Sequence, residues 1–374
     1  MKIGIDARFW GPEGKGLGRY TQKLIENLEK IDQTNQYRIF VKPSSYETYQ
    51  PKNPNFIKVL APYRWYSVEE QLKFPALINA QKLDLVHFPH FNVPLLYRRP
   101  YLVTIHDLII THFPTTRATT LGPVKYFFKR LGYQWVIATA VKRSRKVITV
   151  SDFVKNELVK FFKLPETKVA VTYEATDLFQ GEATDPDTVL AQYHISRPYL
   201  LYVGNAYPHK NLEMLVAAFK ELRQRHADVK LVLVGKMDYF YQRLKKMSDD
   251  MGLGGAVIYP GYVPDEHLPA LYQKALLYVF PSLSEGFGLP PLEAMQYGVP
   301  VAAAHSSCLP EILGNGVVYF NPNEKHDIVN VLANLIEQPD KRDELVRLGN
   351  ERVRHFSWET MARQTVDLYQ SMSR

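Results

Sequence analysis

The sequence predicts an α/β fold in which two doubly wound domains, each built on a parallel sheet, face each other across a cleft. Three observations support this prediction. The chain has 374 residues, enough for about two domains. Short β-rich runs alternate with amphipathic helical runs in both halves, which is typical of parallel sheets. A polar segment that carries Pro186 and Pro198 separates the two series.

The first series predicts an N-terminal domain over residues 1–176. Apolar residues recur at helical spacing after the first strand and mark the buried face of a helix. They are Tyr20, Leu24, Leu28 and Ile31. Strands joined through helices are expected to be parallel, because parallel neighbours need a crossover connection. The predicted strands are residues 3–5, 37–41, 85–88, 102–105, 146–150 and 169–172.

The second series predicts a domain over residues 199–356, after a linker at residues 177–198. The face of its first helix is marked by Leu212, Leu215, Phe219 and Leu222. The predicted strands are residues 199–203, 230–234, 257–259, 276–280 and 299–303. Residues 357–374 begin with Ser-Trp-Glu, which suits a helix start. This last helix is expected to return to the N-terminal domain.

Composition excludes several classes of protein. With 46% hydrophobic residues the chain can bury two cores, and no run approaches the roughly 18 apolar residues of a membrane span. Cys308 is the only cysteine, so an intrachain disulfide and a cysteine-based zinc site are excluded. Residues 1–6 read MKIGID, a first strand rather than a signal peptide. These features are typical of a cytoplasmic protein.

The net charge of +8 is unevenly distributed. Residues 1–180 carry 27 Lys and Arg against 15 Asp and Glu, whereas residues 181–374 carry 19 against 23. A basic half indicates an anionic partner, such as a phosphate, a membrane surface or nucleic acid. The alternative is that the charge serves solubility alone.

The most informative segment is residues 285–293, which read EGFGLPPLE. A strand precedes it and a short helix at about residues 290–297 follows, the arrangement that holds phosphorylated ligands in α/β proteins. The two prolines have no N–H, so the donors near this helix start are the amides of Phe287, Gly288, Leu289 and Leu292. Carboxylates repel an anion, so Glu285 and Glu293 are suited to sugar and ribose hydroxyls instead.

A glycine-rich segment follows the first strand. Gly14, Gly16 and Gly18 predict an open loop before a helix, where backbone can approach a phosphate closely. The spacing is not GxGxxG, and no well-placed acid follows about twenty residues later, which argues against nicotinamide binding. The alternative is a surface loop without a ligand.

Two further residues lie at predicted strand ends. His106 follows strand 102–105, where a neutral imidazole could hydrogen-bond a sugar hydroxyl, although a structural histidine is the alternative. Lys210 lies in segment 204–211, just before a helix, where its charge and the helix dipole could both meet a diphosphate. The alternative for Lys210 is a solvated surface side chain.

Two other patterns have competing interpretations. Asp185-Pro-Asp187 resembles a metal-binding DxD pair, but it falls in the predicted linker, so no required metal is predicted. The segment from Leu121 to Lys146 interleaves basic and aromatic residues. It fits either an interfacial helix at the anionic inner face of a membrane or an ordinary core helix.

The order of these segments resembles that of the retaining glycosyltransferases of family 4, which have the GT-B fold, over nearly the whole chain. The most specific element is the pair of glutamates in segment 285–293. The other matching segments are residues 16–18, 104–107, 147–151, 204–211, 306–311 and 356–359.

The resemblance implies a role for each candidate residue. Glu285 would bind hydroxyls of the donor sugar, and Glu293 would bind the ribose. Lys210 would neutralise the leaving diphosphate, and His106 would contact the donor sugar near the reacting centre. Gly16 would let the first loop approach the diphosphate. The other donor-binding residues implied are Gly18, Gly204, Asn205, His209, Phe287, Gly288 and Leu289.

One position departs from the family pattern. Relatives commonly carry a basic residue soon after the glycine at 204, as a second phosphate ligand, whereas this chain has Asn205. Charge neutralisation would then depend on Lys210, with His209 or Arg19 as possible helpers.

The resemblance implies a metal-independent hexosyltransferase of polysaccharide biosynthesis whose donor is a nucleotide sugar and whose acceptor is a glycan or a lipid-linked glycan. It looks most similar to mannosyltransferases, which favours GDP-mannose, with a UDP-sugar as the alternative donor. A sugar-nucleotide epimerase of the same fold is a further alternative. A nucleic-acid-binding module is another alternative function, but the sequence carries no nucleic-acid motif.

Overall fold

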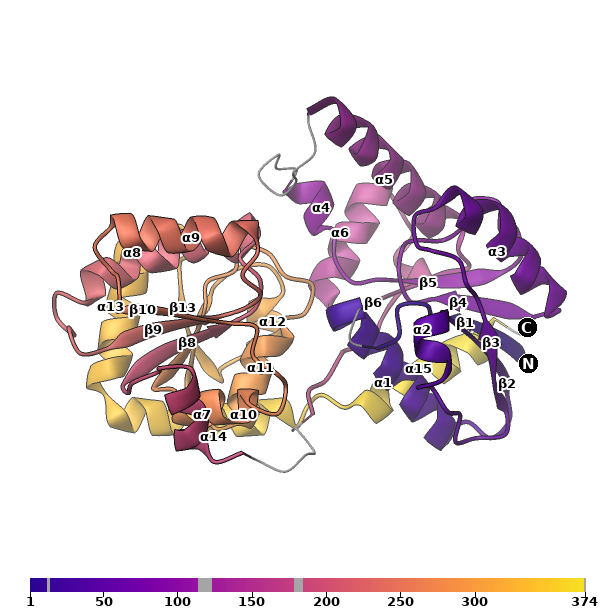
Figure 1. Cartoon of the computed structure of the whole chain (residues 1–374). Coiled ribbons are helices and arrows are strands. Elements are labelled where there is room, and N and C mark those ends of the chain that lie inside the picture. Colours follow the sequence, from indigo (N-terminus) through magenta and orange to yellow (C-terminus); the bar gives the residue numbers. More distant parts are fainter. Residues whose placement is uncertain (12–13, 114–122, 178–183, 373–374) are drawn as a thin grey trace. The chain divides into compact units, whose positions relative to one another are not determined.

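The computed structural model describes residues 1–11, 14–113, 123–177 and 184–372, and at residues 15 and 123–129 it describes the backbone alone. The chain divides into two compact units, coloured from indigo to yellow along the sequence in Figure 1. Unit 1 consists of Met1–Glu174 and Ser357–Arg374, and unit 2 of Ala175–Phe356. Each unit is built on one parallel sheet, which confirms the predicted α/β fold.

Within its described residues, unit 1 holds a seven-stranded sheet in the order β3-β2-β1-β4-β5-β6-β7. The strands are β1 (Lys2–Asp6), β2 (Gln36–Val41), β3 (Phe56–Leu60), β4 (Leu85–Phe88), β5 (Tyr101–Ile105), β6 (Lys146–Thr149) and β7 (Val169–Val171). All neighbouring pairs are parallel. Strands β4 and β5 are buried at every position, as expected for a sheet covered on both faces.

The edge strand β3 was not among the predicted strands. Phe56 is buried, whereas Ile57 and Leu60 are exposed, and Lys58 at the centre breaks the apolar run. The Lys58 ammonium donates 2.7 Å to the Tyr46 carbonyl oxygen, so this charge is satisfied locally at the sheet edge. An edge strand needs less apolar surface than a central one, which is why the hydrophobic pattern did not reveal it.

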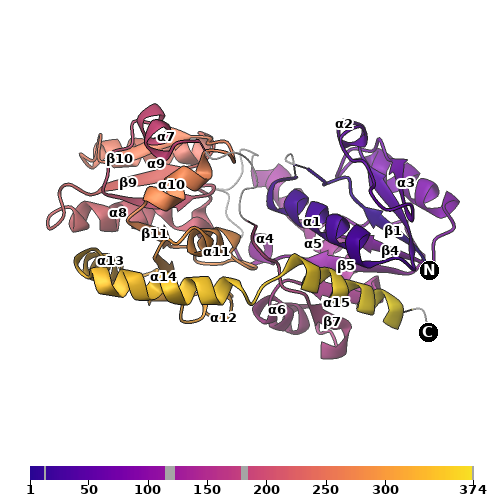
Figure 2. The ribbon, with the colours of Figure 1, turned by 90° about the horizontal axis from the view of Figure 1, so that it is seen from below.

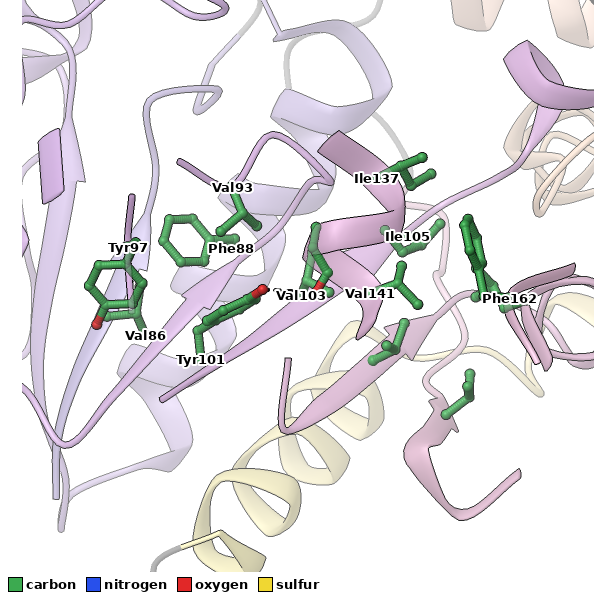
Figure 3. Packing of buried hydrophobic residues seen from close by; sticks show 14 of the residues in the cluster. Val86, Phe88, Val93, Tyr97, Tyr101, Val103, Ile105, Ile137, Val141 and Phe162 are labelled. Atoms are coloured by element: carbon green, nitrogen blue, oxygen red, sulfur yellow. Dashed lines mark hydrogen bonds between the residues drawn. The ribbon is translucent and has the colours of Figure 1, made fainter. Parts of the chain in front are cut away.

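The helices of unit 1 connect the strands and cover the sheet. They are α1 (Lys15–Ile31), α2 (Pro43–Tyr46), α3 (Val68–Ala80), α4 (Ile109–His112), α5 (Pro123–Arg143), α6 (Asp152–Phe162) and α15 (Trp358–Ser371), with a 3₁₀ turn, η3 (Glu166–Lys168). Figure 3 shows how α5 joins the core, where Ile137 and Val141 point toward Val103 and Ile105 of β5.

The terminal helix α15 packs against α1, and Figure 2 shows the two lying side by side. The Ser357 hydroxyl caps its start by accepting from the Thr360 amide at 3.4 Å. Near its end, the buried Tyr369 hydroxyl lies 2.7 Å from His87 Nδ1 of β4. The last segment of the chain is therefore part of the core of unit 1.

Within its described residues, unit 2 holds a six-stranded parallel sheet in the order β10-β9-β8-β11-β12-β13. The strands are β8 (Tyr199–Val203), β9 (Lys230–Val234), β10 (Val257–Gly261), β11 (Leu277–Phe280), β12 (Val301–Ala304) and β13 (Val317–Phe320). The edge strand β13 was not predicted, and its two central residues are only partly buried.

The helices of unit 2 also alternate with its strands. They are α7 (Pro186–Gln192), α8 (Leu212–Leu222), α9 (Tyr239–Asp250), α10 (Leu268–Lys274), α11 (Leu289–Gln296), α12 (Leu309–Leu313), α13 (Lys325–Glu337) and α14 (Pro339–Val353), with a 3₁₀ turn, η4 (Pro208–Lys210).

The segment predicted as a linker, residues 177–198, contains helix α7. Val189 and Leu190 are buried, and α7 packs against α10. Asp185 caps this helix, because its carboxylate accepts from the Thr188 amide at 2.8 Å and from the Thr188 hydroxyl at 2.7 Å. The Asp185-Pro-Asp187 pattern thus has a structural explanation as a helix start.

Candidate active site

The candidate residues of unit 2 lie where its two central strands end. Strands β8 and β11 are paired neighbours, and the strand order reverses between them, with β9 beyond β8 and β12 beyond β11. Gly204 follows β8 directly, and the loop after β11 leads to Glu285 and to helix α11. Open α/β sheets bind ligands at the carboxyl ends of strands at such a switch point.

Lys210 and Glu285 form an ion pair at this point. Lys210 Nζ lies 2.6 Å from Glu285 Oε1, and the two side chains are only 14% and 10% exposed. Lys210 ends η4, immediately before α8, and its ammonium lies 5.7 Å from the centre of the Phe280 ring. The site therefore offers a carboxylate for hydroxyls and an ammonium for phosphate within one hydrogen-bond length of each other.

Two neighbouring loops hold Glu285 in place. The Glu285 amide donates 3.0 Å to the Ser307 hydroxyl, and the Leu283 amide donates 2.8 Å to the His209 carbonyl oxygen. Ser307 has a φ of 48°, in the left-handed region that a non-glycine residue seldom adopts. Such strain is characteristic of positions where the surrounding structure fixes a functional group.

The two glycines at the ends of β8 and β9 allow their backbones to approach each other. Gly204 has a φ of 155°, and a Cβ on Gly235 would lie 2.2 Å from the Gly204 carbonyl oxygen. The Tyr241 hydroxyl donates 2.8 Å to that same oxygen. Gly235 is thus required by the packing of the strand ends, and a Cβ on Gly204 would lie 2.7 Å from the Tyr202 hydroxyl.

Helix α11 begins at Leu289, close to the predicted start, and Gly288 precedes it in the left-handed region with a φ of 93°. Phe287 is buried and its ring lies edge-on to Phe356, 5.4 Å between centres. Its side chain therefore packs in the core, and only its backbone is suited to a ligand. One turn into α11, Glu293 Oε2 accepts from the Tyr272 hydroxyl at 3.3 Å.

In the sequence, Asn205 is the departure from the family pattern, and His209 and Arg19 are the expected helpers of Lys210. Asn205 Oδ1 accepts from the Tyr207 amide at 3.2 Å and shapes the loop after β8. Burial and the nearby Lys210 charge lower the pKa of His209 to about 4, so its imidazole is neutral at pH 7. Help from His209 in neutralising the diphosphate stays a prediction. Arg19 belongs to α1 of unit 1.

His106 lies in unit 1, just after β5, and both of its ring nitrogens face protein acceptors. Nδ1 is 3.1 Å from Glu174 Oε1, and Nε2 is 3.0 Å from the Pro89 carbonyl oxygen. Burial by itself lowers the pKa of His106, but the hydrogen bond and charge of Glu174 outweigh it and raise that pKa. Both ring nitrogens therefore have protein partners in this structure, whereas the sequence predicted that the imidazole would hydrogen-bond a sugar hydroxyl.

The glycines of the first loop differ from the expectation as well. Helix α1 begins at Lys15, so Gly16 and Gly18 lie in its first turn and not in an open loop. A Cβ on Gly18 would lie 2.2 Å from the Gly11 carbonyl oxygen, so Gly18 serves close packing of backbone. A Cβ on Gly16 would meet no atom within 4 Å, so packing does not account for that glycine.

Sequence reasoning missed Glu174, Ser307 and Gly235. Gly235 directly follows a predicted strand, and a glycine at that place is a recognisable sign of close backbone approach. Glu174 lies two residues after the last predicted strand of the first series. Ser307 lies in the matching segment 306–311, but its contact with Glu285 could not be read there, because it depends on a loop from another strand.

Comparison with known families agrees with this arrangement. The model of Glycosyltransferase Family 4 matches residues 14–179, and the model of Glycosyl transferases group 1 matches residues 192–352. The chain is 28% identical over 376 residues to O-antigen chain mannosyltransferase B of Escherichia coli, covering 95% of both chains. It is 27% identical over 346 residues to O-antigen chain mannosyltransferase RfbU of Salmonella typhimurium, covering 88% of this chain and 90% of the relative.

Solved structures share the fold at lower identity. Sucrose-phosphate synthase of Thermosynechococcus elongatus superposes with a TM-score of 0.78 at 21% identity, covering 100% of this chain and 99% of the other. HepE of Anabaena, in complex with UDP and glucose, gives a TM-score of 0.74 at 18% identity, with 99% and 100% coverage. The resemblance seen in the sequence is confirmed, and this chain belongs to the glycosyltransferases of the GT-B fold, with a family 4 domain followed by a group 1 domain.

Proposed function

We propose that this glycosyltransferase moves mannose from GDP-mannose to a glycan or lipid-linked acceptor in polysaccharide biosynthesis, with retention of configuration and without a required metal. The Lys210–Glu285 pair at the ends of β8 and β11 carries the proposal, because it offers charge for a diphosphate beside an acceptor for sugar hydroxyls. Two relatives named as O-antigen mannosyltransferases support the choice of mannose. The alternative donor is a UDP-sugar.

Each residue of unit 2 has a distinct task in this proposal. Glu285 accepts hydrogen bonds from hydroxyls of the sugar, and Glu293 from those of the ribose. Lys210 stabilises the negative charge that grows on the diphosphate as the bond to the anomeric carbon breaks. The amides of Gly288 and Leu289 at the start of α11 face the same anion.

The reaction itself needs no protein nucleophile. The acceptor hydroxyl oxygen bonds to the anomeric carbon while the bond from that carbon to the diphosphate oxygen breaks. The departing phosphate takes the hydroxyl proton on the same face of the sugar, which accounts for retention. The protein contributes positioning and charge stabilisation, and these are tasks that a prearranged ion pair performs well.

A thermal-shift panel tests the donor. GDP, UDP, ADP and their mannose, glucose and N-acetylglucosamine forms are added to the protein with and without EDTA. A nucleotide at 100 times its dissociation constant should stabilise the fold by about 2.7 kcal/mol, and we expect the GDP series alone to do so, unaffected by EDTA. Lys210→Met should abolish that shift.

Three outcomes of the panel count against parts of this proposal. A shift with the UDP series alone would show that the donor is a UDP-sugar and not GDP-mannose. A shift that EDTA removes would contradict metal independence. No shift with any nucleotide would overturn the proposed function.

We further propose that helix α5 attaches unit 1 to an anionic membrane surface. Leu131 and Trp135, one turn apart, are 46% and 63% exposed, whereas Ile137 and Val141 on another face of the helix are buried. Arg143 is occupied elsewhere, because its guanidinium donates to the carbonyl oxygens of Leu95 and Tyr97. The residues at 121 and 122 lie outside the described part of the chain. In that part, no helix is long and apolar enough to span a bilayer.

Vesicle sedimentation tests this attachment. The wild type is expected to sediment with vesicles containing phosphatidylglycerol and to stay in solution with phosphatidylcholine alone. Leu131→Glu with Trp135→Glu should release it from the anionic vesicles, because the change removes apolar area and adds negative charge. Tyr239→Glu, at a 52% exposed position of unit 2, is the matched control and should leave sedimentation unchanged. Equal sedimentation of the double variant and the wild type would contradict the proposal.

A further inference from the structure

The sheet of unit 1 has a switch point of its own, between β1 and β4. From β1 the chain moves outward through β2 and β3, and β4 then returns to the other side of β1. Open α/β sheets bind ligands at the carboxyl ends of the strands at such a point. Five rings come from the loops that follow these strands. They are Phe9 after β1, Trp65 and Tyr66 between β3 and α3, and His90 and Phe91 after β4.

These five rings contact one another and form an aromatic cluster. Phe9 stacks on Trp65, with 4.1 Å between ring centres and 7° between planes, and its centre lies 5.0 Å from that of His90. His90 in turn lies 4.0 Å from Phe91. Tyr66 lies 6.4 Å from His90 with its plane turned by 75°, and 6.3 Å from Phe91. Phe9 is 6% exposed and Tyr66 is 62% exposed, so Tyr66 is the ring that the cluster presents to a ligand.

A buried charge network holds the two loops of the aromatic cluster. Glu70 is completely buried and pairs with the Arg8 guanidinium at 2.6 Å. Its Oε2 accepts from the Tyr66 amide at 2.8 Å, and its Oε1 accepts from the Asn92 side-chain amide at 2.7 Å. Tyr66 has a φ of 59°, a left-handed conformation that a bulky residue seldom adopts. The network fixes this strained backbone, as is characteristic of positions that serve a function.

The chemistry of the aromatic cluster suits an uncharged ligand with hydroxyl groups. Burial lowers the pKa of His90 to about 3, so its imidazole is neutral at pH 7. His90 Nδ1 accepts from the Asn92 backbone amide at 3.4 Å, so the ring proton lies on Nε2. Among the residues that the structure describes, none accepts from this Nε2–H. Lys42 is engaged with the cluster, because its ammonium lies 4.9 Å from the centre of the Trp65 ring.

We propose that Tyr66 and His90 bind a sugar ring of the glycan acceptor, with the apolar face of the sugar on the Tyr66 ring and a sugar hydroxyl accepting from His90 Nε2. This inference rests on the proposed function for the reaction that uses the bound sugar. A sugar ring has C–H groups on its faces and hydroxyls around its edge, so an exposed aromatic ring beside a neutral donor matches both parts. Every group named belongs to unit 1, so the subsite is complete within that unit.

Saturation-transfer NMR tests the subsite without any need for activity. The protein is mixed in turn with the methyl α-glycosides of mannose, glucose, galactose, N-acetylglucosamine and rhamnose. We expect the wild type to transfer saturation to the mannoside, and Tyr66→Ala to lose most of that transfer. Tyr66→Phe keeps the ring and should retain it. Tyr239→Ala, at a 52% exposed position of unit 2, is the matched control and should also retain it.

Kinetics separates acceptor binding from donor binding. With GDP-mannose as donor and methyl α-mannoside as acceptor, Tyr66→Ala should raise the acceptor KM by about tenfold, because it removes one stacked ring. His90→Phe keeps the shape of the ring and loses the N–H, and it should raise the same KM by a similar factor. In both variants kcat and the donor KM should stay within about twofold of the wild type, since the contact is made before and during transfer alike.

The outcomes distinguish failure of the subsite from failure of the proposed function. If the wild type transferred saturation to none of the glycosides, or Tyr66→Ala matched the wild type, the subsite would be overturned. Unchanged saturation transfer in Tyr66→Ala, together with loss of its sedimentation with anionic vesicles, would make Tyr66 a membrane contact instead. An unchanged acceptor KM in Tyr66→Ala would show that the bound sugar is not the acceptor. Saturation transfer that depends on Tyr66, in a wild type that moves no mannose, would overturn the proposed function and leave the sugar subsite standing.

Discussion

Glu285→Gln is expected to lower kcat/KM for sugar transfer by about 10³, while the protein remains folded. The amide has nearly the same shape as the carboxylate, but it cannot hold the charge of Lys210, whose ammonium lies 2.6 Å away. Lys210 then loses its fixed position, and the sugar loses its strongest hydroxyl acceptor. Both effects act at the reacting centre, where a small misplacement costs a large factor in rate.

The control and the partner variant make this result specific. Glu351→Gln breaks an exposed ion pair with Arg347 and should leave transfer unchanged, because exposed pairs contribute little. Lys210→Met should cost as much as Glu285→Gln, and the double variant little more, because residues that act as a unit are not additive. If the turnover of Glu285→Gln were within threefold of the wild type, the Lys210–Glu285 pair would have no role in catalysis.

Arg8→Met is expected to lower the free energy of unfolding of unit 1 by about 3–5 kcal/mol. The Arg8 side chain is completely buried, and its guanidinium lies 2.7 Å from Asp6 Oδ2 and 2.6 Å from Glu70 Oε1. Methionine fills much of the same volume beside the Phe74 ring, which the guanidinium contacts at 4.0 Å. Two buried carboxylates would then remain without a cation, which is the costly part of the change.

The pH dependence gives this second prediction a distinctive sign. Burial raises the pKa of Glu70, although Arg8 opposes the rise. Without Arg8 that pKa rises further, so the folded variant binds a proton more readily than the unfolded chain does. The difference in unfolding free energy between the wild type and Arg8→Met should therefore become smaller as the pH falls. A deficit that is the same at pH 5 and pH 8 would show that the loss comes from packing and not from charge.

Tryptophan fluorescence during urea unfolding measures this effect in unit 1 alone. All four tryptophans of the chain belong to that unit, namely Trp10, Trp65, Trp135 and Trp358. Lys73→Met is the control, because Lys73 forms an exposed pair with Glu69 on the same helix as Glu70. It should change the unfolding free energy by less than about 1 kcal/mol.

The sequence predicted the fold class because the signals for it are local. Alternation of strand and helix patterns, and a helix start at Ser357, can each be read within a short window. The edge strand β3 was not predicted, because Lys58 interrupts its apolar run. The edge strand β13 was not predicted either, although its sequence, VVYF, is apolar throughout. Helix α7 was not predicted, because a short helix with two buried residues, Val189 and Leu190, resembles a polar loop in sequence.

By itself, the sequence determined the two α/β series, the strand ends at which candidate residues lie, and the glycine and glutamate segment after β11. Tertiary structure alone decided which of these residues meet. Lys210 and Glu285 are 75 positions apart, His106 and Glu174 are 68 apart, and His87 and Tyr369 are 282 apart. A parallel sheet brings distant strand ends to one edge, so the partners of a charge depend on strand order, and strand order has no local signature in the chain.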